Sequence, residues 1–76
     1  MEGIREILVV DAQGLSCPQP VILARQAIKS ISSGLVEVLV DTGTQRDNIM
    51  RLASMENWSA RVDDTPEGAY RITLEK

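Results

Sequence analysis

The chain passes from a strand to a helix within residues 7–20, whose sequence is ILVVDAQGLSCPQP. The first four residues are apolar, continuous and mostly β-branched, which is typical of a strand covered on at least one face. A short polar loop follows, in which Gly14 is free to adopt a positive φ. Pro18 and Pro20 then suit a first helical turn, where a missing N–H removes no intrahelical bond and the fixed φ is already helical. The stretch therefore predicts a strand, a loop and a rigidly started helix.

The same strand–helix order then occurs a second time. Apolar residues at steps of three and four continue the first helix to residue 31, and Gly34 is expected to end it as a left-handed cap. Residues 35–40 form a second strand with three valines on one face. Thr44 is expected to cap the second helix, with Asp47 in the capping-box position, and Asn57 to end it.

The chain closes with a β-hairpin, because residues 58–62 and 70–74 alternate around the polar turn 63–68. The element order is β-α-β-α-β-β, and helical crossovers favour parallel pairing of the first two strands. The predicted fold class is α/β: a two-layer α/β sandwich with a four-stranded mixed sheet and two helices on one face. Residues 1–76 are expected to form a single domain, because the chain is too short for two cores. The open sheet face is expected to expose part of residues 7–10.

Composition excludes several kinds of site. The absence of His excludes Cys–His and Ser–His–Asp catalysis and His-ligated zinc within this chain, and one Cys forms neither an internal disulfide nor a thiolate cluster. We therefore expect no metal and no cofactor. A net charge of −3 and only one Trp and one Tyr argue against direct nucleic-acid binding. No apolar run approaches the roughly 20 residues of a membrane helix, and neither an export signal nor a cysteine pair is evident, so we predict a cytoplasmic location.

Cys17 is the residue most suited to chemistry, because it lies where the loop turns into the first helix. Helix dipole and free N–H groups at such a position lower a Cys pKa from about 8.5 into the range of roughly 3.5–7.5. A thiolate without an adjacent base can attack or carry sulfur, but it is poorly equipped for hydrolysis. The alternative is a small buried Cys followed by prolines that merely start a helix. A presented thiol gains from a rigid helix start whereas a core thiol does not, so we favour the reactive interpretation.

Residues 11–21, DAQGLSCPQPV, resemble the signature of the TusA/SirA/YedF sulfur-carrier family, whose mark is Cys-Pro-x-Pro at the start of the first helix. The order of elements matches as well, so the resemblance covers nearly the whole chain. Residues 41–49 are closer to the YedF-like branch, linked by name to selenium metabolism, than to the tRNA-thiolation branch. Asp11, Gly14, Pro18 and Pro20 are the residues that support the motif.

The resemblance implies that Cys17 accepts sulfane sulfur as a persulfide. The donor would be a cysteine desulfurase or another sulfur donor protein, and a downstream acceptor protein would receive the sulfur, in sulfur, selenium or tRNA-thiolation metabolism. Several points stay open: whether the relay counts as a sulfurtransferase enzyme, whether selenium replaces sulfur, and the oligomeric state. The chain is either a stand-alone member or a domain of a longer protein.

Parallel pairing of the first two strands brings the loops after Asp11 and Asp41 to one edge of the sheet, where sites of α/β proteins collect. The predicted neighbours of Cys17 are therefore Thr44, Arg46 and Asp47. Arg46 either supports a thiolate or persulfide anion, docks an acidic partner, or is a solvated first-turn residue. Asp47 is favoured as a helix cap over an acid or base, and Asp11 as a turn residue over a proton acceptor.

Other features leave further alternatives. Arg25 and Lys29 lie one turn apart on the first helix and form either a docking surface for a sulfur donor or a solvated face. Trp58, Met50 and Met55 are expected to pack in the core or at its edge. The main alternative function is a non-catalytic binding or regulatory module that contacts RNA or a protein partner. A redox switch through intermolecular disulfides of Cys17 is a third possibility.

Overall fold

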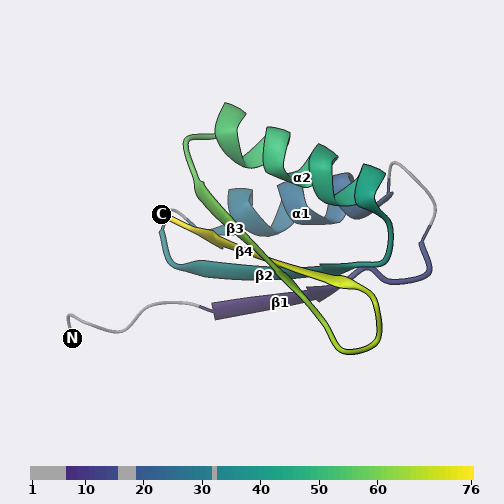
Figure 1. Cartoon of the computed structure of the whole chain (residues 1–76). Coiled ribbons are helices and arrows are strands. Elements are labelled where there is room, and N and C mark those ends of the chain that lie inside the picture. The colour runs from purple at the N-terminus through teal and green to yellow at the C-terminus, as the bar shows by residue number, and fades with distance from the viewer. Residues whose placement is uncertain (1–6, 16–18, 32) are drawn as a thin grey trace.

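The structure is a computed structural model that describes residues 7–15, 19–31 and 33–76. Four strands form one sheet in the order β1-β2-β4-β3, and two helices cover one of its faces (Figure 1). Strand β1 pairs with β2 in parallel, whereas β4 pairs antiparallel with both β2 and β3. The predicted two-layer sandwich with a mixed sheet is confirmed. The elements are β1 (Ile7–Asp11), α1 (Gln19–Ser30), β2 (Leu35–Val40), α2 (Gly43–Met55), β3 (Ser59–Asp64) and β4 (Tyr70–Glu75).

The core lies between the helices and the inner face of the central strands. Alternation in β2 sends its valines toward the helices, and alternate residues of β4 point the same way because the register pairs Val36 with Leu74 and Val38 with Ile72. Both helices contribute a stripe of small and branched residues. The fully buried core side chains include Ala24, Val36, Val38, Val40, Ile49, Ala53, Ile72 and Leu74.

The end of the first helix differs from the prediction. Helix α1 ends at Ser30, so the expectation that Gly34 is its left-handed cap is wrong. Gly34 has a φ of 134° and exchanges two backbone hydrogen bonds of 3.1 Å with Lys76. The positive φ of Gly34 therefore allows one more backbone pairing beside β2 and does not end a helix. A residue with a side chain would be strained in this conformation.

The start of the second helix also differs. Thr42, not Thr44, is the N-cap: it is extended (φ −133°, ψ 151°), and its side-chain oxygen accepts a hydrogen bond from the Gln45 N–H at 3.2 Å. Thr44 lies inside the helix because the chain already becomes helical at Gly43. The expected N-cap at Thr44, with Asp47 as its capping-box partner, is therefore wrong.

The predicted end of the second helix at Asn57 is confirmed. Asn57 adopts a φ of 64°, the left-handed conformation that reverses the chain after the C-cap residue Glu56. The N–H of Trp58 donates to the carbonyl of Ala53 at 2.8 Å, and the N–H of Asn57 donates to that of Ser54 at 3.3 Å. These two bonds form a Schellman motif, which turns the chain directly into β3.

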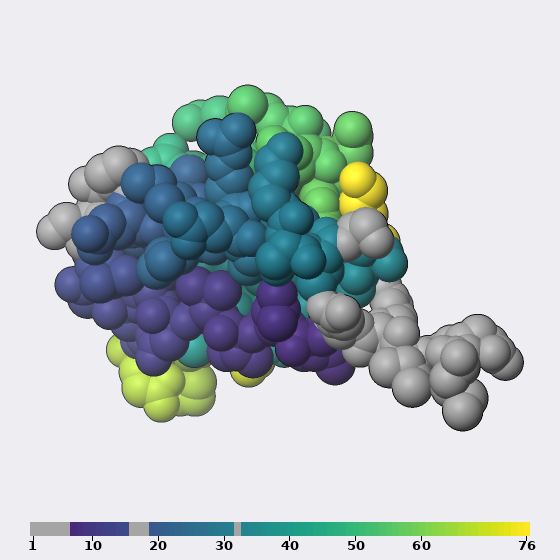
Figure 2. Space-filling model, turned by 180° about the vertical axis from the view of Figure 1, so that it is seen from behind, coloured from purple at the N-terminus to yellow at the C-terminus, as the bar shows by residue number. Residues whose placement is uncertain are grey.

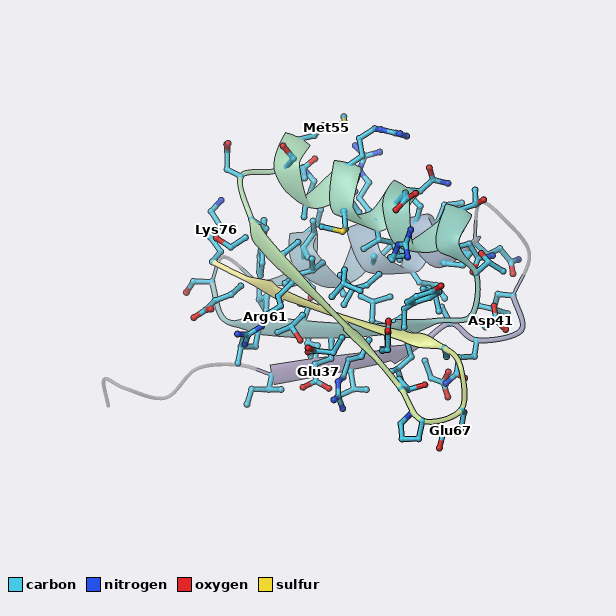
Figure 3. All side chains as sticks on the ribbon, viewed as in Figure 1. Glu37, Asp41, Met55, Arg61, Glu67 and Lys76 are labelled. Carbon is cyan, nitrogen blue, oxygen red and sulfur yellow. The ribbon has the colours of Figure 1, made fainter. Side chains whose placement is uncertain are left out.

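The other face of the sheet has no helix over it. Ile7 and Val9 on edge strand β1 are 61% and 63% exposed, as predicted for this strand. Figure 2 shows the residues of β1 as a band along the surface below α1. Trp58 is buried as expected, but Met55 is 71% exposed and points away from the sheet (Figure 3), so of the two predicted places, the core or its edge, the core is wrong for Met55. Neither helix in the described part of the chain is long and apolar enough to cross a bilayer.

Candidate functional site

Two connections meet at one edge of the sheet. The β1–α1 connection comprises residues 12–18, and the β2–α2 connection comprises residues 41–42. Since β1 and β2 are parallel, both connections leave the carboxyl ends of their strands side by side, as predicted. The N–H of Gly14 donates to Oδ2 of Asp41 at 2.8 Å, and the N–H of Ala12 donates to the carbonyl of Leu39 at 2.9 Å. The first connection is therefore tied to the second connection at Gly14 and to strand β2 at Ala12.

The β1–α1 connection begins with a tight polar turn. Oδ1 of Asp11 accepts a hydrogen bond from the N–H of Gln13 at 3.2 Å, which is the Asx-turn geometry expected of a strand-end aspartate. Gly14 follows with a φ of 78°, and a Cβ atom built there would meet no atom within 4 Å. Gly14 is thus required for its backbone conformation, not for space. These two motif residues shape the path of the chain toward Cys17.

Cys17 and Pro18 lie outside the described residues, and the prediction that Cys17 is the reactive group stays a prediction. The residues on either side are described: Leu15 ends the described part of the connection, and Gln19 begins α1. Pro20 is fully buried in the first turn of α1, where its ring is tolerated as predicted. Helix α1 therefore begins two residues after Cys17.

Gln45 is a residue that the sequence reasoning missed. It is only 6% exposed, and its Nε2 donates to the carbonyl oxygen of Leu15 at 2.8 Å. This contact joins the first turn of α2 to the β1–α1 connection, two residues before Cys17. The readable signal is the pattern Thr42-x-x-Gln45, which is the sequence form of a capping box, although it does not predict the long-range contact.

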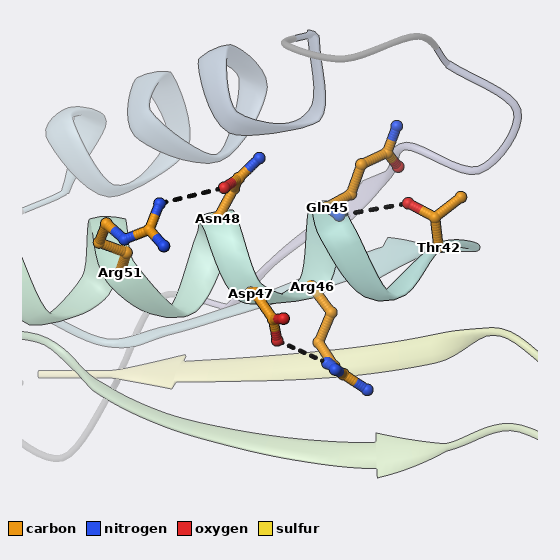
Figure 4. Close-up of polar contacts among 6 residues, drawn as sticks. All are labelled: Thr42, Gln45, Arg46, Asp47, Asn48 and Arg51. Carbon is orange, nitrogen blue, oxygen red and sulfur yellow. Dashed lines mark hydrogen bonds and ion pairs between the residues drawn. The ribbon is translucent and has the colours of Figure 1, made fainter.

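The predicted neighbours Arg46 and Asp47 face another way. Figure 4 shows Gln45 and Arg46 leaving α2 on opposite sides. Nε of Arg46 donates to Oδ1 of Asp47 at 3.0 Å, and its guanidinium carbon lies 4.8 Å from the centroid of the Tyr70 ring on β4. The hydrogen bond from Arg46 to Asp47 raises the pKa of Arg46 above its ordinary value, so the side chain stays cationic. The described contacts therefore bring Gln45, rather than Arg46, to the β1–α1 connection, and Thr44 is exposed on the helix surface.

A shallow groove of about 320 Å³ lies between the outer faces of the two helices. Its lining residues are Val21, Arg25, Asn48, Arg51, Leu52 and Met55. Arg25 and Arg51 are exposed, and Nη1 of Arg51 donates to Oδ1 of Asn48 at 3.2 Å. Lys29, the other residue predicted for docking, instead pairs with Glu56 at 3.2 Å across the two helices. The groove combines an apolar floor with two cationic side chains.

A small α/β sandwich with a cysteine before its first helix defines a recognisable class of protein. A family model described as Sulfurtransferase TusA matches residues 8–76, so the chain belongs to the TusA family. The crystal structure of a SirA-like protein from Desulfitobacterium hafniense is similar to this chain, with a TM-score of 0.86 and 30% identity over 92% of this chain and 96% of that one. The TusA/SirA resemblance is confirmed, and membership of the family indicates a sulfur-carrier role. The placement in the YedF-like branch stays a prediction.

Proposed function

We propose that the protein accepts sulfane sulfur as a persulfide on Cys17 and passes it to an acceptor protein. The observation that carries the proposal is the TusA family match over residues 8–76, within which Cys17 is the sole thiol. The absence of His leaves no Cys–His pair for hydrolysis within the chain. Group transfer between thiols is the chemistry that these residues favour.

The transfer needs no external oxidant. The Cys17 thiolate attacks the terminal sulfur of the donor's persulfide, a new S–S bond forms on Cys17, and the bond between the two donor sulfurs breaks. The donor cysteine leaves as a thiolate and takes a proton from solvent, which balances the proton that Cys17 released. A thiolate of the acceptor protein then attacks the terminal sulfur on Cys17 by the same exchange and regenerates the carrier.

The start of α1 favours the thiolate form of Cys17. The first turn of this 12-residue helix carries no acidic side chain, so no carboxylate there opposes the positive end of the dipole. A thiol two residues before such a turn is expected to have a pKa below its ordinary value. This gives a reactive sulfur near neutral pH without a general base.

The groove between α1 and α2 is the surface we propose for the sulfur donor protein. Its apolar floor and its two arginines suit an acidic segment with an apolar anchor. Replacing Arg25 by Glu is expected to slow the uptake of sulfur without unfolding the protein. The matched control is Arg61→Glu on β3, an exposed arginine on the sheet face away from the helices (Figure 3). Equal rates for both variants would argue against this docking surface.

Intact-mass measurement tests the proposed function. The protein is incubated with a cysteine desulfurase and cysteine, and a mass gain of one sulfur atom is expected, removed by reductant and absent in Cys17→Ala. A mass unchanged in the wild type, or equally raised in Cys17→Ala, would falsify the proposal. The same experiment with selenium in place of sulfur tests the link to selenium metabolism that the YedF-like loop predicts. We infer that the protein acts in the cytoplasm with either element.

A further inference from the structure

The side chain of Gln45 does not make the local capping contact that its position predicts. It is the third residue of α2 after the N-cap Thr42, where a capping box would turn the glutamine side chain back to the N–H of the cap residue. Half of the box is present, because the Thr42 hydroxyl accepts from the Gln45 N–H at 3.2 Å. The side chain of Gln45 instead donates from Nε2 to the carbonyl oxygen of Leu15 at 2.8 Å. A local capping contact has been replaced by a contact to the other connection.

The other end of the same amide is also buried. Oε1 of Gln45 is buried and has no hydrogen-bond partner within the described ranges 7–15, 19–31 and 33–76. Exchanging Oε1 and Nε2 would place two acceptor oxygens against each other at Leu15, so the hydrogen-bond network fixes the orientation. Buried polar atoms are normally paired, and leaving one unpaired is unfavourable for folding. Stability alone would favour an apolar side chain here, and such exceptions collect at functional positions.

The contact acts close to the proposed reactive group. Cys17 is two residues from Leu15, a span of at most about 7 Å along the chain. Beyond Cys17 the chain enters α1 at Gln19. The Leu15 carbonyl is thus the last described anchor before the thiol, and Gln45 is the side chain that holds it.

We propose that Gln45 is a positioning residue for Cys17. By fixing the Leu15 carbonyl to the first turn of α2, it sets the path of the described part of the connection, from which the chain continues to Cys17. This inference rests on the proposed function for its biological meaning, but its test needs no sulfur donor.

The test is the rate at which iodoacetamide alkylates Cys17 as a function of pH. Gln45→Met keeps the length of the side chain and removes both its Nε2 donor and its Oε1 acceptor. We expect the apparent pKa of Cys17 to move up by about one unit toward its ordinary value, which lowers the alkylation rate by about tenfold at a pH well below both pKa values. The melting temperature is expected to stay within about 4 °C of the wild type, since a hydrogen bond is lost together with a buried acceptor that has no partner among the described residues.

The matched control is Gln13→Met, in the same connection. Gln13 is exposed and its side chain bonds only to Asp11 among the described residues, so its alkylation profile is expected to match the wild type. Asp11 and Asp41, the described carboxylates beside the connection, are unchanged in both variants. A wild-type profile for Gln45→Met, or an equal shift for Gln13→Met, would overturn the proposal.

A second variant covers the case in which Gln45→Met does not fold. Gln45→Asn keeps the amide but is one methylene too short to reach Leu15, so the same shift in the Cys17 profile is expected, and a wild-type profile would count against Gln45. The sulfur-transfer experiment is read separately. A shifted profile without sulfur uptake would keep the positioning role and remove the relay.

Discussion

The two connections at the carboxyl edge of the sheet are built in opposite ways. The β2–α2 connection consists of residues 41–42 only, and its Thr42 caps the start of the helix that follows. The longer β1–α1 connection is held from outside, by Asp41 at Gly14 and by Gln45 at Leu15. The described part of the β1–α1 connection is therefore held in place by side chains of the β2–α2 connection and of α2. Cys17, the thiol that we propose as the sulfur carrier, belongs to the β1–α1 connection, and we infer that the start of the neighbouring helix α2 positions it.

The largest expected effect comes from weakening the packing of α2, the helix that follows the β2–α2 connection. Ile49 is fully buried in α2, and Ile49→Ala is expected to lower the free energy of unfolding by about 2–5 kcal/mol, since it removes buried methyl groups and leaves a cavity. Urea unfolding measures the loss. The control Met50→Ala, at the partly exposed next position, is expected to stay within about 0.5 kcal/mol of the wild type. Similar losses for the two variants would mean that α2 is not held by its buried stripe.

A smaller loss of stability is expected from a substitution in the β1–α1 connection. Gly14→Ala should cost about 1–2 kcal/mol, because the φ of 78° is strained for an L residue although space is available. Gly68→Ala in the β3–β4 turn is a matched control, with a φ of 87° and equally open space. Both variants should lose similar stability in urea, but only Gly14→Ala should change the alkylation rate of Cys17. Equal alkylation rates in the two variants would break the distinction between the connections.

The smallest effect concerns the helix cap. Thr42→Ala is expected to lower the free energy of unfolding by about 1 kcal/mol because the Gln45 N–H loses its acceptor. Thr44→Ala, two residues later and exposed, should change it by less than about 0.5 kcal/mol. Thermal or urea unfolding compares the pair. A larger loss of stability for Thr44→Ala would mean that Thr44, the N-cap predicted from the sequence, is the true cap.

The order of the elements and the core were predictable because they depend on periodicity. The alternation in β2 and the three-to-four spacing in the helices are local patterns, which can be recognised from residues close together in the sequence. Thr42 and Thr44 are equally good caps by composition, and the choice depends on the residue at which the extended strand gives way to helix. The role of Gly34 was predicted wrongly for a related reason: its positive φ serves pairing with Lys76, which is far from it in the sequence.

The site was predictable in part. Parallel pairing of β1 and β2 was enough to bring the two connections together, and Asp11 and Gly14 have the turn geometry that their residue types favour. The contact of Gln45 with Leu15 could not be predicted from the sequence, because a glutamine at a capping-box position predicts a local contact with the N-cap residue. The direction of Arg46 was not readable either, since it depends on Tyr70 lying beneath α2.

The Schellman turn after α2 has a practical consequence for spectroscopy. It tucks the sole indole of the chain, Trp58, under the helix layer at 6% exposure. Its fluorescence therefore reports the docking of α2 on the sheet and is expected to be silent to changes confined to residues 12–18. Fluorescence emission and alkylation are therefore two independent probes: emission reports on the folded body, and alkylation reports on Cys17.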